Sequence, residues 1–589
     1  MATINGTADW GIVPLDWDGS QLSYMSLNYR FNYLKSANDQ LRYEIVTSKG
    51  GEGAEPAVEG DVVNVIFKVE TSVTGNYWTT IGTIKKSRDI TNKRYNGGNA
   101  PAGHRFTVDV SQLVADQLSY SLCPINKGTW QSNFYGGMNG GLTMQDNVIN
   151  KDGISGGSAI SIFNVSDNGT FRRLKVSATF EIMGSAANNG ALEIATDDAL
   201  VSQTITAINS VNQFERDSVF YRKYNVDLST GYNFLTRCPN WSGGSVTQDF
   251  KKPVRIDEQA EWLQFYITKG DSTDISSAGG GSDIVGAMGI EIKTYIGNTL
   301  ENTFYLDDFQ QNVLQSIAGG FAQVNAQQNQ MFIQNISPYY INNTAALKAL
   351  PANPPTRSAT DIAGNWNAYT GNKITNSTTR YTANLVKVGL FSPYTVLEVS
   401  YSYNYTIDRE SENIPYGYVR FHWLNSLGAI DSYTAKRDVV EGLTISRDVI
   451  ERKSGDRTWY QADSNYSDAS YADNAYISDT MRGGDIYKGG REVTNVNADR
   501  VQSVYTEPLN KSVATWLEEI MLSPNVWIEK DTEATKMGNT RNPYLRPSTK
   551  EYIPVIITNS DIETVNQENG LVRFNIEYTL AHKVQTQRN

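Results

Sequence analysis

Strict alternation of apolar and polar residues, repeated along much of the chain, is the feature that most constrains its fold. A period of two places successive side chains on opposite faces of an extended strand, whereas a helix needs a period of about 3.6. One dry face and one wet face indicate antiparallel sheets that are solvated on one side. Three segments of the N-terminal third show the pattern, with these apolar sets: Val63, Val65, Phe67 and Val69; Phe106, Val108 and Val110; Leu174, Val176, Ala178, Phe180 and Ile182.

The alternation returns in the second half of the chain, within VLEVSYSYNYTID and VRFNIEYTLAHK. Long strands of this kind favour sandwiches or barrels, and the absence of a strict repeat period argues against a propeller or solenoid. The sequence therefore predicts a mainly β protein of several antiparallel β-sandwich-like domains with long loops. The apolar sets of these two segments are Leu397, Val399, Tyr401, Tyr403, Tyr405 and Ile407, and Val572, Phe574, Ile576, Tyr578 and Leu580.

One segment, NKSVATWLEEIMLSP, follows helical periodicity instead. Its apolar residues fall at spacings of three and four, with Asn510 placed as N-cap and Ser523–Pro524 as a stop. We expect an α-helix over 511–522 that packs on a sheet, in preference to a helix that offers its stripe to a partner. The stripe consists of Val513, Trp516, Leu517, Ile520 and Met521.

A chain of 589 residues is too long for one hydrophobic core, and its length suggests roughly three to five domains. Composition shifts divide it into four parts. The last part is expected to contain a hairpin at 419–434, a polar loop at 454–490 and the helix at 511–522. The parts are an N-terminal β-sandwich-like domain with a glycine-rich insertion (1–185), a second β-rich domain (186–309), a Gln/Asn-rich arm or linker (310–360) and a C-terminal β domain (361–589).

The charge pattern and the apolar runs exclude two classes of partner. The net charge is −12 and the pI about 5.0, without the basic stripe that a nucleic-acid binder needs. The longest apolar runs fall short of the ~18 residues of a membrane span, and the N-terminus lacks a basic start followed by an apolar run. We therefore expect synthesis in a cytosol without a cleaved secretory signal. Cys123 and Cys238 are interpreted as reduced, structural thiols.

The stretch FHWLNSLGAIDSYT holds a histidine, an aspartate and a serine, the residue types of a hydrolytic relay. If residues 425–428 form a four-residue loop, His422 pairs with Asp431 and Trp423 pairs with Ile430. Ser432 would then point to the opposite face, because side chains alternate along a strand. This register predicts a solvated cross-strand His–Asp pair instead of a relay.

Other chemistry finds little support in the sequence. The histidines His104, His422 and His582 lack ligand spacing, and HExxH, CxxC and P-loop motifs are missing. DNVINKDG, at 146–153, lacks the third-position ligand and the closing glutamate of a calcium loop. We therefore predict no catalytic, cofactor-binding or metal-binding residues and no cofactor. Because a glycosidase needs only two carboxylates, the sequence leaves that activity open.

Sugar binding also stays open. Exposed aromatic residues beside Asp and Asn, as in WYQADSNYSDASY, suit stacking on pyranose rings. The same composition suits protein interfaces, which are enriched in Tyr and Trp, and we favour the interface.

Two segments resemble structural proteins of tailed bacteriophages. In YNFLTRCPNWSGG…KKPVRIDEQAEWLQFYI (232–267), a strand that ends in a Leu-Thr…Pro turn precedes a strand with an apolar core. The second segment runs from the hairpin at 421 to residue 589. Its order of hairpin, variable loop, helix with a Trp-Leu core, Ser-Pro turn and closing strands is similar to C-terminal modules of phage tail and baseplate components.

This resemblance implies a non-enzymatic virion protein of the tail or baseplate region, assembled in the host bacterial cytoplasm. Its expected partners are other copies of itself and neighbouring virion proteins, with host surface glycan as a further candidate. The alternatives are a carbohydrate-recognising receptor-binding tail fibre protein, with Trp459 and Tyr460 as contact residues, and a glycan-cleaving enzyme.

Overall fold

The computed structural model confirms a mainly β protein, with three helices among the residues that it describes and several antiparallel sheets. Three hydrophobic cores divide these residues into an N-terminal, a middle and a C-terminal body. The described residues, with short gaps inside some ranges and a few shorter pieces besides, are 34–38, 41–46, 62–72, 77–87, 103–118, 171–184, 191–195, 200–211, 234–243, 249–267, 286–306, 330–349, 367–389, 396–409, 418–451, 491–531, 550–559 and 570–581.

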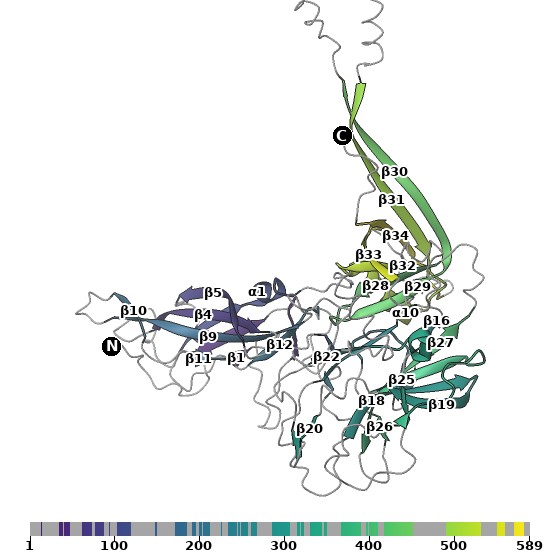
Figure 1. Ribbon diagram of the computed structural model, residues 1–589. Helices are drawn as coiled ribbons and strands as arrows, with labels where there is room; N and C mark the ends of the chain where they lie inside the picture. Colours follow the sequence, from purple (N-terminus) through teal and green to yellow (C-terminus); the bar gives the residue numbers. More distant parts are fainter. Residues whose placement is uncertain are drawn as a thin grey trace, which may run out of the picture.

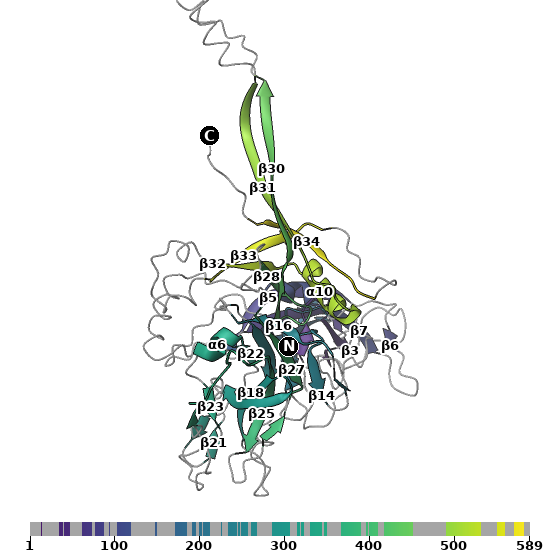
Figure 2. The same cartoon turned by 90° about the vertical axis from the view of Figure 1, so that its right-hand side faces the viewer.

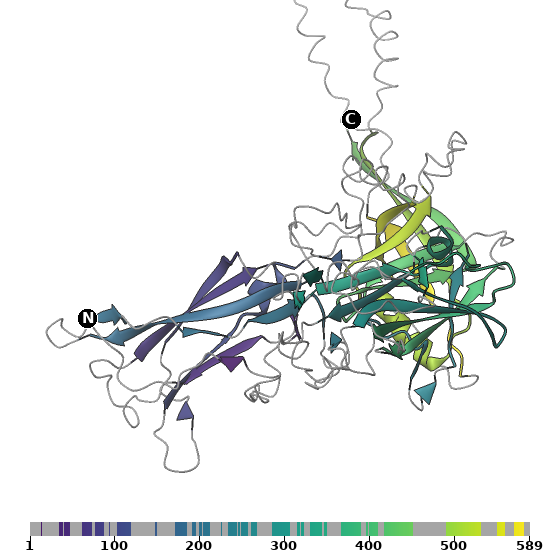
Figure 3. The ribbon, with the colours of Figure 1, turned by 60° about the horizontal axis from the view of Figure 1, so that its bottom comes forward.

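The N-terminal body is a sandwich of two sheets that share one core (Figure 3, purple and blue strands). The predicted dry faces fill that core, since Phe67, Phe106 and Val176 are all buried. One sheet has the order β1-β3-β7-β6 and the other β2-β12-β9-β4-β5, with β10 and β11 also on β9. The elements are β1 (Val13–Pro14), β2 (Leu34–Ser36), β3 (Arg42–Val46), β4 (Val62–Ser72), β5 (Thr79–Ser87), β6 (Lys93–Arg94), β7 (Gly103–Asp109), α1 (Ser111–Ala115), β9 (Phe171–Met183), β10 (Leu192–Ile194), β11 (Leu200–Val201) and β12 (Ile205–Ile208).

The middle body is built on a ten-stranded sheet, and a four-stranded sheet and α6 contribute Leu263 and Ile341 to the same core. Its tyrosine ladder is buried as the alternation predicts, with Tyr403 and Tyr405 on the dry face. The elements are β8 (Val148–Ile149), β13 (Asn225–Val226), β14 (Trp241–Gly243), β15 (Val246–Thr247), β16 (Lys252–Arg255), β17 (Trp262–Ile267), β18 (Gly286–Ile296), β19 (Thr299–Leu306), β20 (Gln315–Ile317), β21 (Gly320–Ala322), β22 (Gln330–Asn335), α6 (Pro338–Asn343), β23 (Leu347–Ala349), β24 (Asn367–Ala368), β25 (Arg380–Gly389), β26 (Val396–Glu398) and β27 (Ser402–Asp408); β20 and β21 pair only with each other among the described strands.

The C-terminal body is a seven-stranded antiparallel sheet, ordered β29-β28-β32-β33-β34-β31-β30, with helix α10 packed on one face. The helix has the predicted bounds, because Asn510 accepts a hydrogen bond from the Val513 amide and the chain turns extended at Ser523. The elements are β28 (Val419–Leu424), β29 (Ile430–Ala435), β30 (Arg437–Glu451), β31 (Arg491–Tyr505), α10 (Lys511–Leu522), β32 (Val526–Asp531), β33 (Lys550–Ile557) and β34 (Asn575–Leu580).

The boundaries of the bodies differ from the predicted domain limits. Strands β11 and β12 pair with β9, and β12 also pairs with β2, so they belong to the N-terminal sandwich and not to a second domain beginning at 186. Residues 330–349, predicted as part of an arm, supply β22, α6 and β23 to the middle body. Strands β24 to β27 pair within the middle sheet, so the C-terminal sheet begins near 418 and not at 361. These errors share one cause, since strands far apart in the sequence complete each sheet.

The C-terminal sheet continues into a long two-stranded ribbon of β30 and β31, which projects away from the three bodies in both side views (Figure 1, Figure 2). The loop predicted at 454–490, which contains Trp459 and Tyr460, lies outside the described residues. Cys123 and His582 lie outside them as well. Among the described helices, none is both long and apolar enough to cross a bilayer.

Candidate functional site: a buried polar layer at the hairpin

The hairpin at 419–435 is confirmed, but its predicted register is wrong by one residue. His422 pairs with Ser432 and Trp423 pairs with Asp431, because the loop has five residues, 425–429, instead of four. The Asn425 side chain fixes that loop by accepting hydrogen bonds from the amides of Leu427 and Ala429 at 3.0 and 2.9 Å. The slip brings His422 and Ser432 to the same face of the hairpin.

Both faces of the hairpin are buried, and they differ in chemistry. Phe421 and Trp423 face α10 within the apolar core. Arg420 and His422 face the middle body, where Arg420 contacts Glu261, the residue before β17. All six residues of β29 are buried, so this part of the sheet lies between two protein layers.

The polar face forms an ionic layer of four charged side chains. Lys252 and Arg420 are the cations, and Glu261 and Glu529 are the anions. Glu261 accepts from the Lys252 ammonium and, at 2.8 Å, from Arg420 Nη2. Arg420 Nε lies 3.8 Å from the carboxylate of Glu529 on β32. The four charged side chains are between 0 and 5% exposed. Each charge has an opposite partner, which is the condition for burying ions without a prohibitive desolvation cost.

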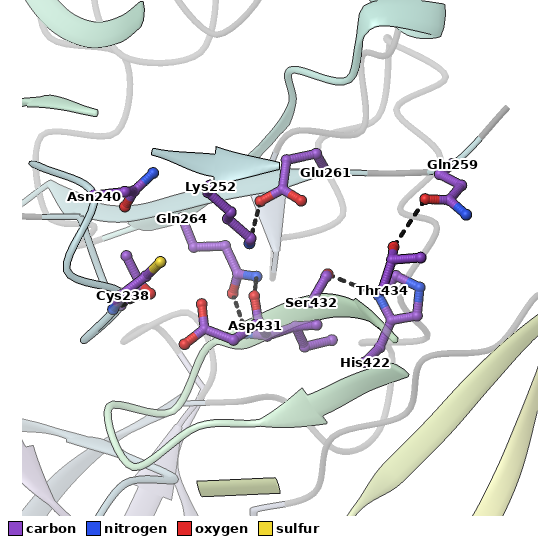
Figure 4. A network of polar contacts seen from close by, with 12 residues as sticks. Cys238, Asn240, Lys252, Gln259, Glu261, Gln264, His422, Asp431, Ser432 and Thr434 are labelled. Carbon is purple, nitrogen blue, oxygen red and sulfur yellow. Dashed lines mark hydrogen bonds and ion pairs between the residues drawn. The ribbon is translucent and has the colours of Figure 1, made fainter. Parts of the chain in front are cut away.

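Neutral hydrogen bonds extend this layer across the junction. Arg420 Nη1 donates to the Thr434 hydroxyl at 2.9 Å, and that hydroxyl donates to Gln259 Oε1 at 3.0 Å. The side chain of Gln264 on β17 forms two hydrogen bonds of 3.1 Å with the backbone N–H and C=O of Ile430. The middle body therefore continues the hydrogen bonding of β29 with side chains (Figure 4).

Ser432, His422 and Glu529 form a connected line inside the layer. Ser432 Oγ lies 2.9 Å from His422 Nδ1, and His422 Nε2 lies 3.0 Å from Glu529 Oε2. Burial lowers the pKa of His422 below its ordinary value, against the opposing effect of Glu529, so the ring is neutral at pH 7. A carboxylate only accepts, so the Nε2–H donates to Glu529 and Nδ1 accepts from the Ser432 hydroxyl.

This line has the residue types of a serine hydrolase relay, but two features oppose that role. In the Ser-His-Asp template the serine meets Nε2 and the acid meets Nδ1, the reverse of the arrangement found here. The Ser432, His422 and Glu529 side chains are 1, 0 and 2% exposed, so a substrate carbonyl cannot approach the hydroxyl. The predicted solvated His–Asp pair is wrong, and the line serves as internal hydrogen bonding of the layer.

A fluorophosphonate probe tests this interpretation, because it labels activated serines that solvent can reach. We expect the folded chain to remain unlabelled at Ser432, with the same labelling in wild type and in Ser432→Ala. The measurement is intact-mass and peptide mass spectrometry after incubation near pH 8. Stoichiometric labelling that Ser432→Ala abolishes would contradict the interpretation and establish a working nucleophile.

The hairpin loop is the place where the three bodies meet. Asn425 Nδ2 donates to the carbonyl of Leu235 in the middle body at 2.8 Å. The Val211 amide, which follows the N-terminal sandwich, donates to the Ser426 carbonyl at 2.8 Å. Gly428 has φ +79°, and a Cβ there would lie 2.5 Å from Ile208 Cγ2, so both backbone conformation and space require glycine.

Among the described residues, two acidic side chains near this loop have no cationic group within hydrogen-bond distance. Asp431 accepts from Trp516 Nε1 at 2.9 Å and from Asn425 Nδ2 at 3.1 Å, and burial raises its pKa. Glu519 accepts from the Ser426 hydroxyl at 2.5 Å, with Arg237 Nε 3.6 Å away. Burial, followed by the charge of Asp431, raises the pKa of Glu519 to about 7.

The raised pKa of Glu519 makes stability depend on pH. A raised folded-state pKa favours the protonated native protein, so the contribution is fully present below about pH 4.5 and is lost as pH rises through about 7. We expect Glu519→Gln, which keeps the acceptor for Ser426, to match wild type near pH 4.5. At pH 8.5 it should be more stable by about 3 kcal/mol, the worth of roughly 2.5 pKa units.

Urea unfolding at the two pH values measures this difference. Glu518→Gln, at a half-buried neighbour on the same helix, is the matched control and should show a much smaller pH-dependent difference. If Glu519→Gln proved less stable than wild type at pH 8.5, the ion pair with Arg237 would outweigh burial and our reading of this carboxyl would fail.

Cys238 is a buried free thiol in the C-terminal core, consistent with a structural role. Burial raises its pKa well above the ordinary value, so it is a poor nucleophile. Lys252, Glu261 and Glu529 were not among the residues predicted from the sequence. The sequence signal was confined to Glu261, a charged residue beside the apolar strand WLQFYI, since its partner Arg420 lies 159 positions away and Glu529 lies 107 positions from His422.

No protein-family model matches the chain, and no curated protein matches it.

Proposed function

We propose that this chain is a non-enzymatic structural subunit of a virion, in the tail or baseplate region of a tailed phage, that acts through protein–protein interfaces. One observation supports the non-enzymatic part most strongly. Among the described residues, Ser432 and His422 have the residue types of a hydrolytic relay, and both are buried in a layer that joins two bodies. Residues committed to holding a junction are not free to bind a substrate.

The phage assignment is supported by the two segments that resemble tail and baseplate proteins. In the structure these segments lie on the two sides of the same junction. Residues 232–267 supply Lys252, Glu261 and Gln264, and the second segment supplies His422, Ile430 and Ser432. The two parts of the resemblance thus belong to one contacting unit, as expected if a shared architecture underlies it.

The proposed role also fits the polar layer that joins the middle and C-terminal bodies. A subunit under mechanical load needs bodies that do not slide on one another, and an ionic layer with paired hydrogen bonds has a single low-energy register. The broad sheets and the projecting ribbon offer surface for contacts with other subunits.

Quantitative mass spectrometry of particles purified from a culture that produces this chain tests the proposal. We expect the chain in the particles at a fixed ratio to the other tail subunits, with no release of reducing ends from host polysaccharide by the purified protein. A chain found only outside particles would contradict the structural role. Release of reducing ends at steady turnover would instead favour the glycan-cleaving alternative.

Host glycan binding by the purified chain, lost in Trp459→Ala or Tyr460→Ala, would favour a receptor-binding protein on the same particle.

A further inference from the structure

The hairpin loop at 425–429 lies where the three bodies meet, and it contacts the end of the N-terminal body in two ways. The Val211 amide donates a hydrogen bond to the Ser426 carbonyl at 2.8 Å. The backbone at Gly428 approaches so closely that a Cβ there would lie 2.5 Å from Ile208 Cγ2. The loop is therefore both a packing surface and a hydrogen-bond acceptor for that body.

The segment just before Val211 is fixed to the N-terminal sandwich. The Ala37 amide, directly after β2, donates to the Ile208 carbonyl at 2.8 Å. Asn38 Nδ2 donates to the Ser210 carbonyl at 3.1 Å. Because these hydrogen bonds tie the segment to the end of β2, its position follows that of the sandwich. The hydrogen bond from Val211 to the loop therefore couples the whole N-terminal body to the hairpin.

On its other side the loop rests on helix α10. Glu519 Oε1 accepts a hydrogen bond from the Ser426 hydroxyl at 2.5 Å, and Glu519 is only 9% exposed. Ser426 therefore contacts α10 through its hydroxyl and the N-terminal body through its carbonyl. We call the contacts of loop 425–429 with Ile208, Val211 and Glu519 the joint.

Two charges face Glu519 from other elements, and a third lies behind them. Arg237, which precedes β14, places Nε 3.6 Å from Glu519 Oε1. Asp431 of β29 is buried and acts on Glu519 as a second negative charge. Lys252 of β16 acts electrostatically on Asp431, but its ammonium is already bound by Glu261. An ionised Glu519 is thus buried beside one cation and one anion, with little water to solvate it.

Ionisation of Glu519 therefore disfavours the closed joint. Burial, followed by the charge of Asp431, raises the pKa of Glu519 from its ordinary value of 4.5 to about 7. When the loop moves off α10, water reaches the carboxylate, so this open state gains on the closed state as pH rises through that interval. With these two pKa values, the ratio of open to closed states rises about 30-fold between pH 5.5 and pH 8.5.

We propose that the joint is a pH-dependent hinge, closed while Glu519 is protonated and opened when ionised Glu519 releases the hairpin loop and with it the N-terminal body. The joint connects bodies that have separate hydrophobic cores, so it can open without unfolding either of them. The junction between the middle and C-terminal bodies should stay closed, since its ionic layer rests on Glu261 and Arg420. The hinge acts within the isolated chain, so its test does not depend on the virion role.

Hydrogen exchange of the full chain near pH 5.5 and near pH 8.5, measured by mass spectrometry and corrected for intrinsic exchange rates, tests the hinge. In wild type, the protection of peptides that contain Val211 or loop 425–429 should fall about 30-fold over this range. Glu519→Gln keeps an acceptor for the Ser426 hydroxyl but cannot ionise, so its protection should change less than ~3-fold. Glu518→Gln, the matched control on the same helix, should retain the wild-type fall.

Peptides from β9 and β25 distinguish the hinge from global unfolding. These strands contribute to the hydrophobic cores of the N-terminal and middle bodies and should keep their protection at both pH values. Small-angle X-ray scattering supplies a second readout, because an open joint lets the N-terminal body move away from the hairpin. The radius of gyration should grow with pH in wild type and Glu518→Gln, and stay constant in Glu519→Gln.

Three results would overturn the hinge. The first is an equal fall of protection in wild type and in Glu519→Gln, which would remove this carboxyl as the cause. The second is a wild-type joint whose protection and radius of gyration do not change with pH. The third is a loss of protection that extends to β9 and β25, which would show general destabilisation instead of a hinge.

Discussion

Replacing Trp516 with alanine is expected to destabilise the C-terminal body by ~3–5 kcal/mol, the range for removing a buried aromatic side chain. Trp516 is 1% exposed on α10. Its ring lies 5.3 Å from that of Trp423 and 6.2 Å from that of Tyr433, centroid to centroid. The loss therefore leaves a cavity between the helix and the hairpin, where neighbouring backbone can collapse only in part.

The same substitution also removes a hydrogen bond from a buried carboxyl. Trp516 Nε1 donates to Asp431 at 2.9 Å, and a buried acceptor that loses its donor costs about 1–3 kcal/mol. Trp516→Phe separates the two effects, since it keeps most of the packing and removes only the donor. We expect this variant to lose about 1–3 kcal/mol, less than alanine.

Urea unfolding, monitored by hydrogen exchange of residues 511–531, measures the loss of stability in the C-terminal body. Leu522→Ala is the matched control on the same helix, because Leu522 is 74% exposed, and should change stability by less than about 0.5 kcal/mol. A loss below about 1 kcal/mol in Trp516→Ala would show that the apolar stripe of α10 is not core.

Glu261→Gln should cost a comparable ~3–5 kcal/mol by a different mechanism. The substitution keeps the shape of the side chain but leaves Lys252 and Arg420 buried without their shared counter-charge. Removing one partner of a buried pair is far more costly than the net worth of the pair, because the remaining charge cannot reach water. Because Glu261 belongs to the middle body and Arg420 to the C-terminal sheet, the change should also loosen the junction.

A double-mutant cycle with Arg420→Met measures the coupling across the junction. The double variant should be destabilised by less than the sum of the losses in the two single variants. Each substitution removes the buried charge that the other substitution leaves without its partner. Lys85→Met is the matched control, because Lys85 pairs with Glu181 at the surface with half of its side chain exposed, and should stay within about 0.5 kcal/mol of wild type. Strict additivity at Glu261 and Arg420 would show that the layer does not couple the two bodies.

The fold class and the dry faces could be predicted from the sequence because they depend on local periodicity. The helix bounds could be predicted for the same reason, since Asn510 and Ser523–Pro524 encode its ends in the chain itself. The body boundaries could not, because β12 adds to β2, and β16 to β27, across more than 100 residues, with parallel pairings that leave no local trace.

The hairpin shows how a small error reverses a functional inference. The residues that mark the turn are evident, but loop length depends on Asn425 folding its side chain back onto the loop and on Gly428 adopting a positive φ. A one-residue slip exchanges the face of every side chain on one strand. Ser432 and His422 therefore lie on one face and not on opposite faces, and it is their burial that predicts no hydrolysis at this pair.

A density map of the assembled particle is the most direct test of the account. We predict that copies of the chain occupy symmetry-related positions. In each copy Glu261 should still form its ion pair with Arg420, and Ser432 should be enclosed between the middle and C-terminal bodies. A map in which the middle body has moved off the hairpin, so that Ser432 and His422 line an open cleft, would contradict a purely structural role.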